Sequence, residues 1–440
     1  MTGPQGPAPL RGASLAMLAA LALSGCTLAT PKAAEATKAA DRPGAELLAA
    51  RPERKVEGSA VIAELAARRS IVPPGSSYDR IARAVIAADS GSARSELRVK
   101  QLQAEARSKN WLPSLGPSVN LSSLGTLATS LLLEQALFDN GRRKAEREFA
   151  VADVEVAAVN LAVEGNRRVH QALTLYVDAE AARGRAAVAE AALRRLADFD
   201  RIMALRVQGG VSNMAEQTVL RQKLIEMQAA LQADRDAAML AAAELDSMAG
   251  APVSASAGLT QLPGSMPAVT PLAVHRAEAE KERTVAELKM IRAGYMPGVS
   301  ASSNLTNGGA IGVTGGFGNG LRPGRAAALE AVTAGADAAA ARVIQAGQEA
   351  ARRRQALELR IAALDRQEAA QQELAAQTRA NLRRFEDQYK AGVRPLMDLV
   401  TQHEALAAME RDLVNMRHER ARARLDIARD LGLLADGAGL

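Results

Sequence analysis

Two long runs without proline constrain the fold of this chain more than any other feature. The first extends from Arg142 to about Gln208 and contains only two glycines, Gly165 and Gly184. Ala, Leu, Arg, Glu and Val dominate it, and helices tolerate or favour all of them. One continuous helix over this run would be about 100 Å long at 1.5 Å per residue. Ordinary globular helices are several times shorter, so the run predicts a rod or the wall of a tunnel.

The second half of the chain repeats the arrangement of the first. A second proline-free run extends from Gly324 to Arg394. Three landmarks recur in the same order at nearly constant offsets: Trp111-Leu112-Pro113 as Tyr295-Met296-Pro297 after 184 residues, Phe138 as Phe317 after 179, and Gly210-Val211-Ser212 as Gly392-Val393-Arg394 after 182. Such self-similarity indicates an internal duplication. We predict two repeats, residues 78–270 and 271–440, each with a helix, two strands, a long helix, a tight turn and a return helix.

Short strands are predicted at matching places in the two repeats. Leu115, Val119 and Leu121 alternate with serine and asparagine, and residues 129–137 form a second apolar stretch. Alternation of this kind is typical of a strand, and each stretch has about the length that a membrane-spanning strand needs. Glu134 fits such a strand only if it faces a lumen. One chain supplies four strands, too few to close a membrane barrel, so three chains would have to pool twelve.

The glycine-rich stretch Asn307–Gly320 superficially suggests a phosphate-binding loop. It lacks the lysine of a P-loop and the strand, glycine loop and helix order that such a site needs. Val299 and Ala301 alternate with serines before it, and Ile311 and Val313 begin a new apolar stretch inside it. We therefore interpret it as the hairpin of the second strand pair.

Glycine, proline and capping residues set the remaining boundaries. Gly209-Gly210 would end the first long helix, and Ser212 or Asn213 can cap the next one, with Glu216 in its first turn. Return helices are predicted at 213–248 and 395–431, and a further helix at 272–293. Helical spacing also marks residues 78–110, with Gly91 as a candidate interruption.

Apolar residues on the first long run mark two seams rather than one. A helix in a single-layer cylinder touches a neighbour on each side, whereas a two-stranded coiled coil needs only one clean seam. The pattern favours the cylinder over the simple coiled coil. The first seam is Leu193, Leu196, Met203 and Val207, and the second is Phe199, Ile202 and Leu205.

Composition and charge argue against several functions. The chain is 24% charged and 2% aromatic, which fits long, closely packed helices better than an ordinary globular core. Its net charge of +6 arises from arginines that alternate with acidic residues, so we predict solvated helix faces and no nucleic-acid partner. No catalytic constellation is recognisable, and the histidines lack ligand spacing, so we expect no enzyme activity, cofactor or metal. The histidines are His170, His275, His403 and His418.

The amino-terminal segment has the pattern of a secretory signal. Arg11 precedes an apolar run, Ala13 to Leu23, which is too short to span a membrane and leads into Leu23-Ser24-Gly25-Cys26. This end resembles a bacterial lipoprotein signal, which implies cleavage before Cys26 and a lipid on its thiol and new amino group. The alternative is an ordinary signal with an incidental Cys26. We predict a signal peptide over 1–25 and a lipid-anchored tether over 26–77, with a short helix at 61–69. The residue after Cys26 is Thr27, and this residue type weakly favours localisation of the lipoprotein to the outer membrane.

Taken together, the chain resembles the TolC-like outer-membrane efflux protein family over residues 78 to 435. The resemblance rests on the Leu112-Pro113 start of the first strand, Leu137-Phe138-Asp139-Asn140-Gly141-Arg142-Arg143 before the long helix, the two glycine-valine turns and the duplication. It implies a mainly α homotrimer with a small membrane β part. A twelve-stranded outer-membrane β-barrel would continue into a periplasmic α-helical barrel. It also implies a periplasmic adaptor and an inner-membrane transporter as partners, and export of drugs, toxic small molecules or proteins.

The resemblance also implies roles for particular residues. Four aromatic residues would lie at the periplasmic side of the barrel, either as a membrane-interface girdle or as fillers of the junction. Five residues of the two turns are candidate adaptor contacts, although glycines also end helices without any partner. Asp398 matches a position where the family places a constricting, cation-selective aspartate ring; the next acidic position of the family is Thr401 here. The aromatics are Trp111, Phe138, Tyr295 and Phe317, and the turn residues are Arg206, Gly210, Ser212, Gly392 and Arg394.

Two other functions remain open from the sequence. A lipid-anchored periplasmic adaptor should have one helical hairpin between β-rich halves, which the two matching repeats disfavour. A structural coiled-coil lipoprotein has no need for polar-lined strand pairs at matching places. The predicted function is therefore an outer-membrane duct of an efflux or type I secretion system.

Overall fold

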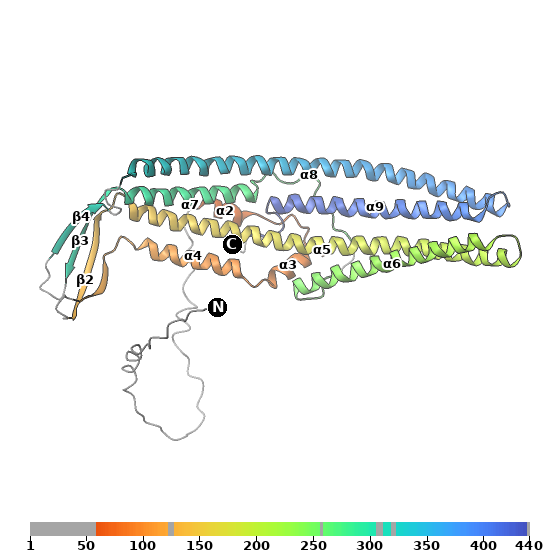
Figure 1. Cartoon of the computed structure of the whole chain (residues 1–440), viewed down its shortest axis with the longest axis horizontal. Helices are drawn as coiled ribbons and strands as arrows, with labels where there is room; N and C mark the ends of the chain where they lie inside the picture. Colours follow the sequence, from red (N-terminus) through yellow and green to blue (C-terminus); the bar gives the residue numbers. More distant parts are fainter. Residues whose placement is uncertain (1–58, 122–126, 256–257, 305–310, 318–322, 438–440) are drawn as a thin grey trace, which may run out of the picture. The chain divides into compact units, whose positions relative to one another are not determined.

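The two proline-free runs are the two longest helices of the protein (Figure 1). The computed structural model describes residues 59–121, 127–255, 258–304, 311–317 and 323–437. Its elements are α2 (Ala60–Ala67), α3 (Ser77–Ala87), α4 (Ser92–Ser108), β1 (Ser114–Leu121), β2 (Leu127–Phe138), α5 (Arg142–Gln208), α6 (Met214–Ala249), α7 (Leu272–Gly294), β3 (Pro297–Asn304), β4 (Ile311–Phe317), α8 (Arg325–Lys390) and α9 (Leu396–Asp430). The prediction of a mainly helical chain with a small β part is confirmed. Among the helices of the described ranges, none combines the length and hydropathy of a membrane span.

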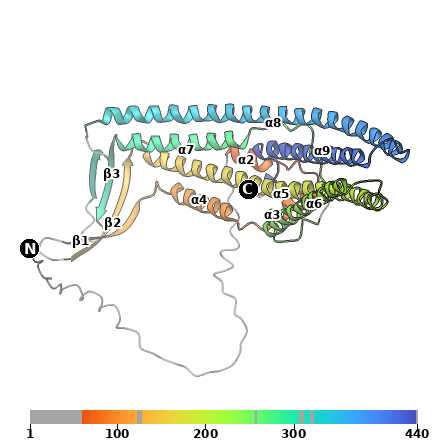
Figure 2. The ribbon, with the colours of Figure 1, turned by 45° about the vertical axis from the view of Figure 1, so that its right-hand side comes forward.

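The helices pack side by side in one layer. Helix α5 contacts α4 and α6 along one side and α7 and α9 along the other, and α8 packs on α7 and α9 (Figures 1 and 2). Helices α7 and α9 therefore lie end to end between α5 and α8. This arrangement explains the two seams of α5: Leu196 and Phe199 are buried against neighbouring helices. Leu205, expected in the second seam, is exposed in the single chain.

The long helix α5 begins at a sharp joint after β2. Asn140 and Gly141 both have left-handed backbone conformations, with φ values of 52° and 81°. The Asp139 carboxylate accepts hydrogen bonds from the backbone N–H groups of Gly141 (3.1 Å) and Arg143 (2.8 Å), which satisfies donors that a helix start leaves free. The Asn140 amide donates to the carbonyl of Pro297, the first residue of β3. The joint is thus held both to the helix and to the sheet.

One of the two glycines within α5, Gly184, has a structural reason. A Cβ atom at this position would lie 2.9 Å from Cγ1 of Val414 on α9. Since real Cβ contacts are essentially never that short, the glycine permits α5 and α9 to approach closely. Gly347 in α8 has no such neighbour within 4 Å.

The four strands form one antiparallel sheet in the order β1-β2-β3-β4. Ser114 of β1 lies opposite Glu134 of β2, which in turn lies opposite Ser302 of β3. A bulge between Ala136 and Phe138 shifts the register of the β2–β3 pair just before the joint. Each outer strand, β1 or β4, has only one partner in the described sheet.

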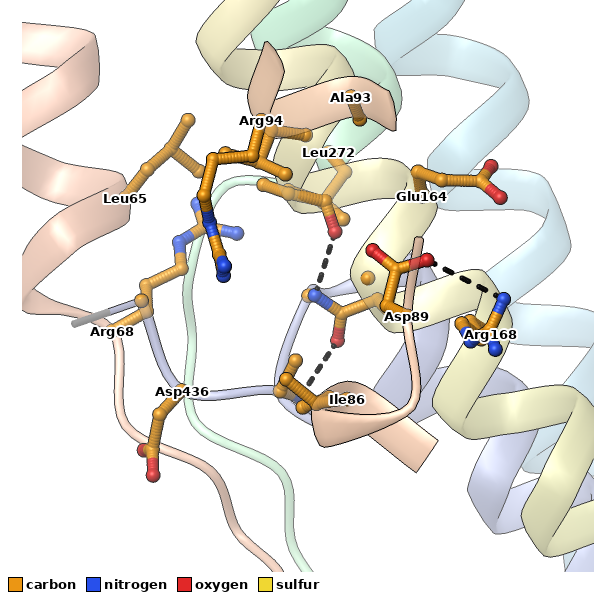
Figure 3. Close-up of a pocket in the computed structure, with 17 residues that line it drawn as sticks. Leu65, Arg68, Ile86, Asp89, Ala93, Arg94, Glu164, Arg168, Leu272 and Asp436 are labelled. Atoms are coloured by element: carbon orange, nitrogen blue, oxygen red, sulfur yellow. Dashed lines mark hydrogen bonds and ion pairs between the residues drawn. The ribbon is translucent and has the colours of Figure 1, made fainter. Parts of the chain in front are cut away.

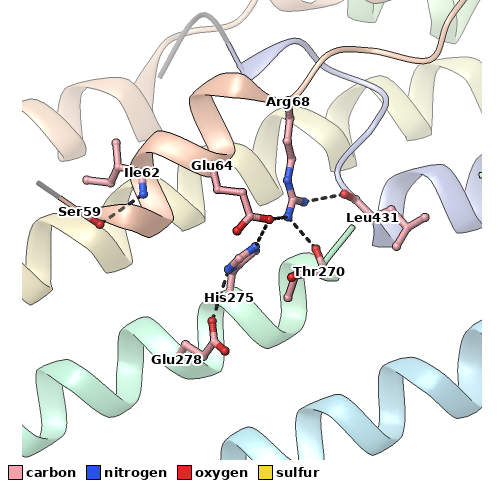
Figure 4. A network of polar contacts seen from close by, with 8 residues as sticks. All are labelled: Ser59, Ile62, Glu64, Arg68, Thr270, His275, Glu278 and Leu431. Atoms are coloured by element: carbon pink, nitrogen blue, oxygen red, sulfur yellow. Dashed lines mark hydrogen bonds and ion pairs between the residues drawn. The ribbon is translucent and has the colours of Figure 1, made fainter. Parts of the chain in front are cut away.

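A network around Arg68, which we call the Arg68 clasp, holds the short helix α2 in place (Figure 4). The Arg68 guanidinium donates to the carbonyl of Leu431 at the end of α9 (2.7 Å) and to the carbonyl of Thr270 just before α7 (2.7 Å). It also pairs with Glu64 of α2 (3.0 Å), whose carboxylate lies 3.1 Å from Nε2 of the buried His275. The clasp therefore joins the facing ends of α7 and α9.

The segment expected as a tether is packed from residue 59 onward. Leu65 and Val72 are buried, and the Ile71 N–H donates to the carbonyl of Leu433 (3.0 Å). The Asn166 side chain of α5 accepts the N–H of Leu434 at 2.8 Å, which fixes the segment after α9 on the long helix. Residues 59–77 therefore pack on the helices. The predicted short helix at 61–69 corresponds to α2.

Candidate functional site

The register of the sheet separates polar from apolar side chains. Cross-strand partners point to the same side of a sheet, and successive residues alternate between the two sides. One side carries Ser114, Glu134, Ser300, Ser302 and Thr314, together with Leu132 and Ala136. The opposite side carries Leu115, Leu131, Leu133, Val299, Ala301, Ile311 and Val313, together with Gln135 and Ser303. We refer to these sides as the polar face and the apolar face.

The apolar face has no cover within the part of the chain that the structure describes. The side chains of Leu115, Ile311 and Val313 are 59%, 76% and 66% exposed. Contiguous exposed apolar surface of this kind marks a site of interaction with a membrane or a partner. The sheet is therefore amphipathic, with two open edges and one bare apolar side.

The predicted interface aromatics occur around the ends of the strands. Trp111 lies between α4 and β1 and is exposed, and its carbonyl accepts a hydrogen bond from the Gln135 side chain (3.2 Å). Phe138 ends β2 and is also exposed, whereas Tyr295 follows α7 and is half-buried. The side chain of Phe317 lies outside the described residues. Cys26, the predicted lipidation site, lies outside them as well.

At the other end of the long helices, the first turn is a tight helix ending. Gly210 has a left-handed conformation, with φ of 71°. The Val211 N–H donates to the carbonyl of Arg206 (2.8 Å), and the Gly210 N–H donates to that of Val207 (3.1 Å). These two bonds define a Schellman motif, for which glycine is the favoured residue. Of the two caps that the sequence allowed, Ser212 and Asn213, it is Asn213 that caps α6, by accepting the N–H of Glu216 at 2.8 Å.

The second turn has the same hydrogen bonds. The Val393 N–H donates to the carbonyl of Gln388 and the Gly392 N–H to that of Tyr389, both at 2.9 Å. Gly392 has φ of 75°. The valine after each left-handed glycine points into solvent: Val211 is 69% exposed and Val393 is 74% exposed. The two turns therefore present the same small apolar feature.

Asp398, in the first turn of α9, has a partner just before the helix. Its carboxylate lies 3.0 Å from the guanidinium of Arg394, four residues earlier. The same guanidinium lies 3.8 Å from the ring centroid of Phe385 and donates to the Gln388 side chain at 2.6 Å. Arg394 and Asp398, which the sequence assigned to different roles, thus form one ion pair beside the second turn.

Below the turns, one apolar cluster joins the two helical hairpins. Met203 of α5, Leu220 of α6 and Leu399 of α9 are buried in it, with Phe385 and Tyr389 of α8 packed against it. Polar contacts also cross this region. The Arg206 guanidinium donates to the Tyr389 hydroxyl at 3.3 Å and lies 5.7 Å from the centroid of its ring. Lys223 of α6 and Glu404 of α9 form an ion pair at 2.5 Å. The turns are therefore held as a unit rather than separately.

The four histidines occupy positions between helices. His170 pairs with Asp426 of α9 (2.9 Å), and His403 stacks against Phe199 with ring centroids 5.1 Å apart. Burial lowers the pKa of both His403 and His418 from the ordinary value, so these rings stay neutral in the folded protein near pH 7. No group of three or more metal-binding side chains occurs within the described ranges.

A small cavity lies next to the Arg68 clasp, where α2, α5 and the residues after α9 meet (Figure 3). Its volume is about 90 Å³. Asp89 and Arg168 pair across it at 3.4 Å, and Glu164 pairs with Arg167 at 2.5 Å. The charges around the cavity therefore largely satisfy one another, and it has the character of a packing gap. The amphipathic sheet and the two turns are the stronger candidates for function.

Comparison with known proteins identifies the fold. No protein-family model matches the sequence, and no curated protein sequence matches it either. Solved structures do match: a membrane protein from Pseudomonas aeruginosa has a TM-score of 0.71 and 17% identity, with 82% of this chain and 91% of that chain covered. The outer membrane protein VceC from Vibrio cholerae has a TM-score of 0.70 and 16% identity, covering 81% and 96%. The CmeC outer membrane channel of Campylobacter jejuni has a TM-score of 0.66 and 11% identity, covering 93% and 96%.

VceC and CmeC are TolC-family outer-membrane channels, and the alignments cover nearly the whole length of each. The chain therefore has a TolC-like fold, as the motifs of its sequence predicted. At such low identity the likeness establishes the architecture, and what the architecture does in this protein is a separate question.

Proposed function

We propose that this protein is the outer-membrane channel of a tripartite efflux or type I secretion system. The observation that carries the proposal is the amphipathic four-stranded sheet, which is continuous with a single layer of long helices. Three chains would join their sheets, edge to edge, into a twelve-stranded β-barrel, and their helices into a periplasmic α-barrel. Cargo would pass along the shared lumen without any chemical change.

The faces and edges of the sheet support the barrel. In a transmembrane barrel the apolar residues face lipid and the polar residues face the lumen. Pairing β4 of one copy with β1 of the next would satisfy the open edges, which a membrane otherwise penalises heavily. Exposed apolar residues on the outermost long helices suit a contact between copies. They are Val219, Ile225, Met239 and Leu240 on α6, and Ile344, Leu359 and Leu374 on α8.

The remaining assignments follow from this placement. Trp111, Phe138, Tyr295 and Phe317 would lie at the periplasmic boundary of the membrane, where aromatic side chains are favoured. Cys26, at the end of a signal peptide over residues 1–25, would carry lipid and anchor the chain to the outer membrane. The two repeats, 78–270 and 271–440, would each contribute one strand pair and one helical hairpin to the wall.

Asp398 would form a ring of three carboxylates at the periplasmic end of the lumen. Arg394 pairs with each Asp398, and its guanidinium offsets part of the negative charge of the ring. We therefore expect cation selectivity to rise when Arg394 is neutralised and to fall when Asp398 is. Single-channel recordings of Arg394→Gln and Asp398→Asn in planar bilayers would measure both changes.

The two turns would meet the periplasmic adaptor, through Arg206, Gly210, Ser212, Gly392, Arg394 and the valines between them. Replacing Val211 and Val393 together by glutamate is expected to stop export, because the exposed apolar side chains of the contact become charged. The turn hydrogen bonds involve only the backbone of these valines, so trimers should still reach the membrane. Export by whole cells measures the loss of function, and the trimer content of the outer membrane measures assembly. Normal export by the double variant would rule out this contact.

The function itself is tested by isolating the protein and measuring conductance. We expect it in the outer-membrane fraction as a heat-modifiable trimer that conducts ions in planar bilayers. A lipid-anchored adaptor or a structural coiled-coil lipoprotein would give neither trimer bands nor conductance. A soluble monomer without conductance would therefore defeat the channel function.

A further inference from the structure

The four strands carry a single ionisable side chain, that of Glu134. The other residues of the strands are apolar, glycine or neutral polar. The register places Glu134 between Ser114 of β1 and Ser302 of β3, and Ser302 lies opposite Gly312 of β4. Glu134 therefore belongs to the polar face, the face opposite Leu133.

The surroundings of Glu134 let its carboxylate project from the sheet. Its direct cross-strand neighbours are serines, and Ala136 follows it on the same face. Its backbone carbonyl, rather than its carboxylate, accepts the Ser114 hydroxyl at 3.2 Å. Within the described residues, none of the ion pairs includes Glu134. The side chain is exposed, so its charge is neither buried nor compensated.

We infer that Glu134 gives the β-barrel a preference for cations, which makes it a specificity-determining residue of the channel. The inference rests on the proposed function, because one carboxylate per chain becomes a ring of three only in a trimeric barrel. The polar face lines the lumen of that barrel, so all three carboxylates would stand at one level of the conduit. The favoured cargo at this level is cationic.

The pore is wide, so the effect of three carboxylates on ion selectivity depends on their distance from the axis and on salt screening. Strands about 4.8 Å apart and tilted by about 40° give twelve strands a circumference of roughly 75 Å and a backbone radius of about 12 Å, so inward-projecting carboxylates lie about 10 Å from the axis. Coulomb's law in water with salt screening then enriches cations roughly twofold at 0.1 M salt and roughly fourfold at 0.01 M. At 1 M salt the Debye length is about 3 Å and the enrichment disappears. The effect is therefore measurable and has a specific dependence on salt.

The test is the reversal potential of purified trimers in planar bilayers under a potassium chloride gradient. Glu134→Gln is expected to lower the ratio of potassium to chloride permeability about fourfold at 0.1 M, because cations lose a twofold enrichment and anions lose an equal depletion, with a larger effect at 0.01 M and none at 1 M. Adding Ser300→Glu to this variant returns a carboxylate to the polar face and should restore the preference. Both variants are also measured in a chain that carries Asp398→Asn, so that cation selectivity from an Asp398 ring at the periplasmic end cannot hide the selectivity of the β-barrel.

The outcomes separate this inference from the proposed function. Trimers that conduct with the same permeability ratio before and after Glu134→Gln at 0.01 M, in both backgrounds, would overturn the inference and leave the channel intact. Failure of Ser300→Glu to restore the preference would also overturn it. The absence of any trimer or conductance in the unaltered protein would overturn the channel function, and the inference with it.

Discussion

Replacing Leu133 by arginine is expected to prevent assembly of the protein in the outer membrane. Leu133 lies on the apolar face, opposite Leu115 of β1 and Ser303 of β3. An arginine facing lipid costs about 2–4 kcal/mol near the membrane midplane, and a trimer would incur this cost three times. The sum is comparable to the whole folding free energy of an ordinary domain. Heat-modifiable trimer in the outer-membrane fraction would therefore be lost.

The neighbouring residue provides a matched control. Leu132 is one position earlier, lies opposite Gly116 and belongs to the polar face. Leu132→Arg changes the same residue type to the same charge in the same strand, but it directs the charge into the lumen. We expect this variant to assemble. Equal loss of trimer in both variants would contradict the assignment of the two faces, and so would equal assembly.

Replacing Asp234 by alanine is expected to cost about 3–5 kcal/mol of folding stability. Asp234 lies on α6 and is 6% exposed. Its two carboxylate oxygens pair with Arg185 of α5 at 2.8 Å and with Arg411 of α9 at 2.7 Å. The carboxylate thus joins three helices, and its removal would leave two guanidinium groups close together with no counter-charge.

Asp236 serves as the control for this prediction. It lies on the same helix, is exposed, and accepts a hydrogen bond from Gln232, four residues earlier, at 2.7 Å. Alanine there should change stability by less than about 0.5 kcal/mol. Urea unfolding of the detergent-solubilised proteins would give both values. If the two alanine variants unfold at the same urea concentration, the Asp234 ion pairs do not stabilise the wall.

The helices could be predicted well because their signals are local. The absence of proline and the helix-forming composition from Arg142 to Gln208 predicted α5. Gly209-Gly210 predicted the turn, and the cap was predicted at Ser212 or Asn213. Gly91 likewise lies between α3 and α4, in a left-handed conformation. Each of these signals involves residues a few positions apart, where sequence and backbone geometry are directly linked.

What the sequence left open depends on pairing between distant residues. Glu134 fitted a membrane strand only on a face toward a lumen, and its partners on β1 and β3 are what place it on the polar face. The sequence alone offered no reason for Gly184, which only its contact with Val414, 230 positions later, explains. By contrast, the ion pair of Arg394 and Asp398 is a local contact at the start of α9 between residues only four positions apart. The roles of the turn residues, Cys26 and Asp398 stay predictions.

The Arg68 clasp has a consequence for how the chain is made. Its donor, Arg68, and its acceptor, the carbonyl of Leu431, are 363 positions apart. At ribosomal speeds of 5–20 residues per second, the acceptor emerges roughly 20–70 s after the donor. The Arg68 side chain therefore waits for the Leu431 carbonyl for almost the entire synthesis, although Leu65 of α2 can pack against Val156 and Val159 as soon as α5 is made. The clasp cannot close before the end of α9 has been made, and a product truncated before α9 cannot complete it, so the contact distinguishes finished chains from unfinished ones.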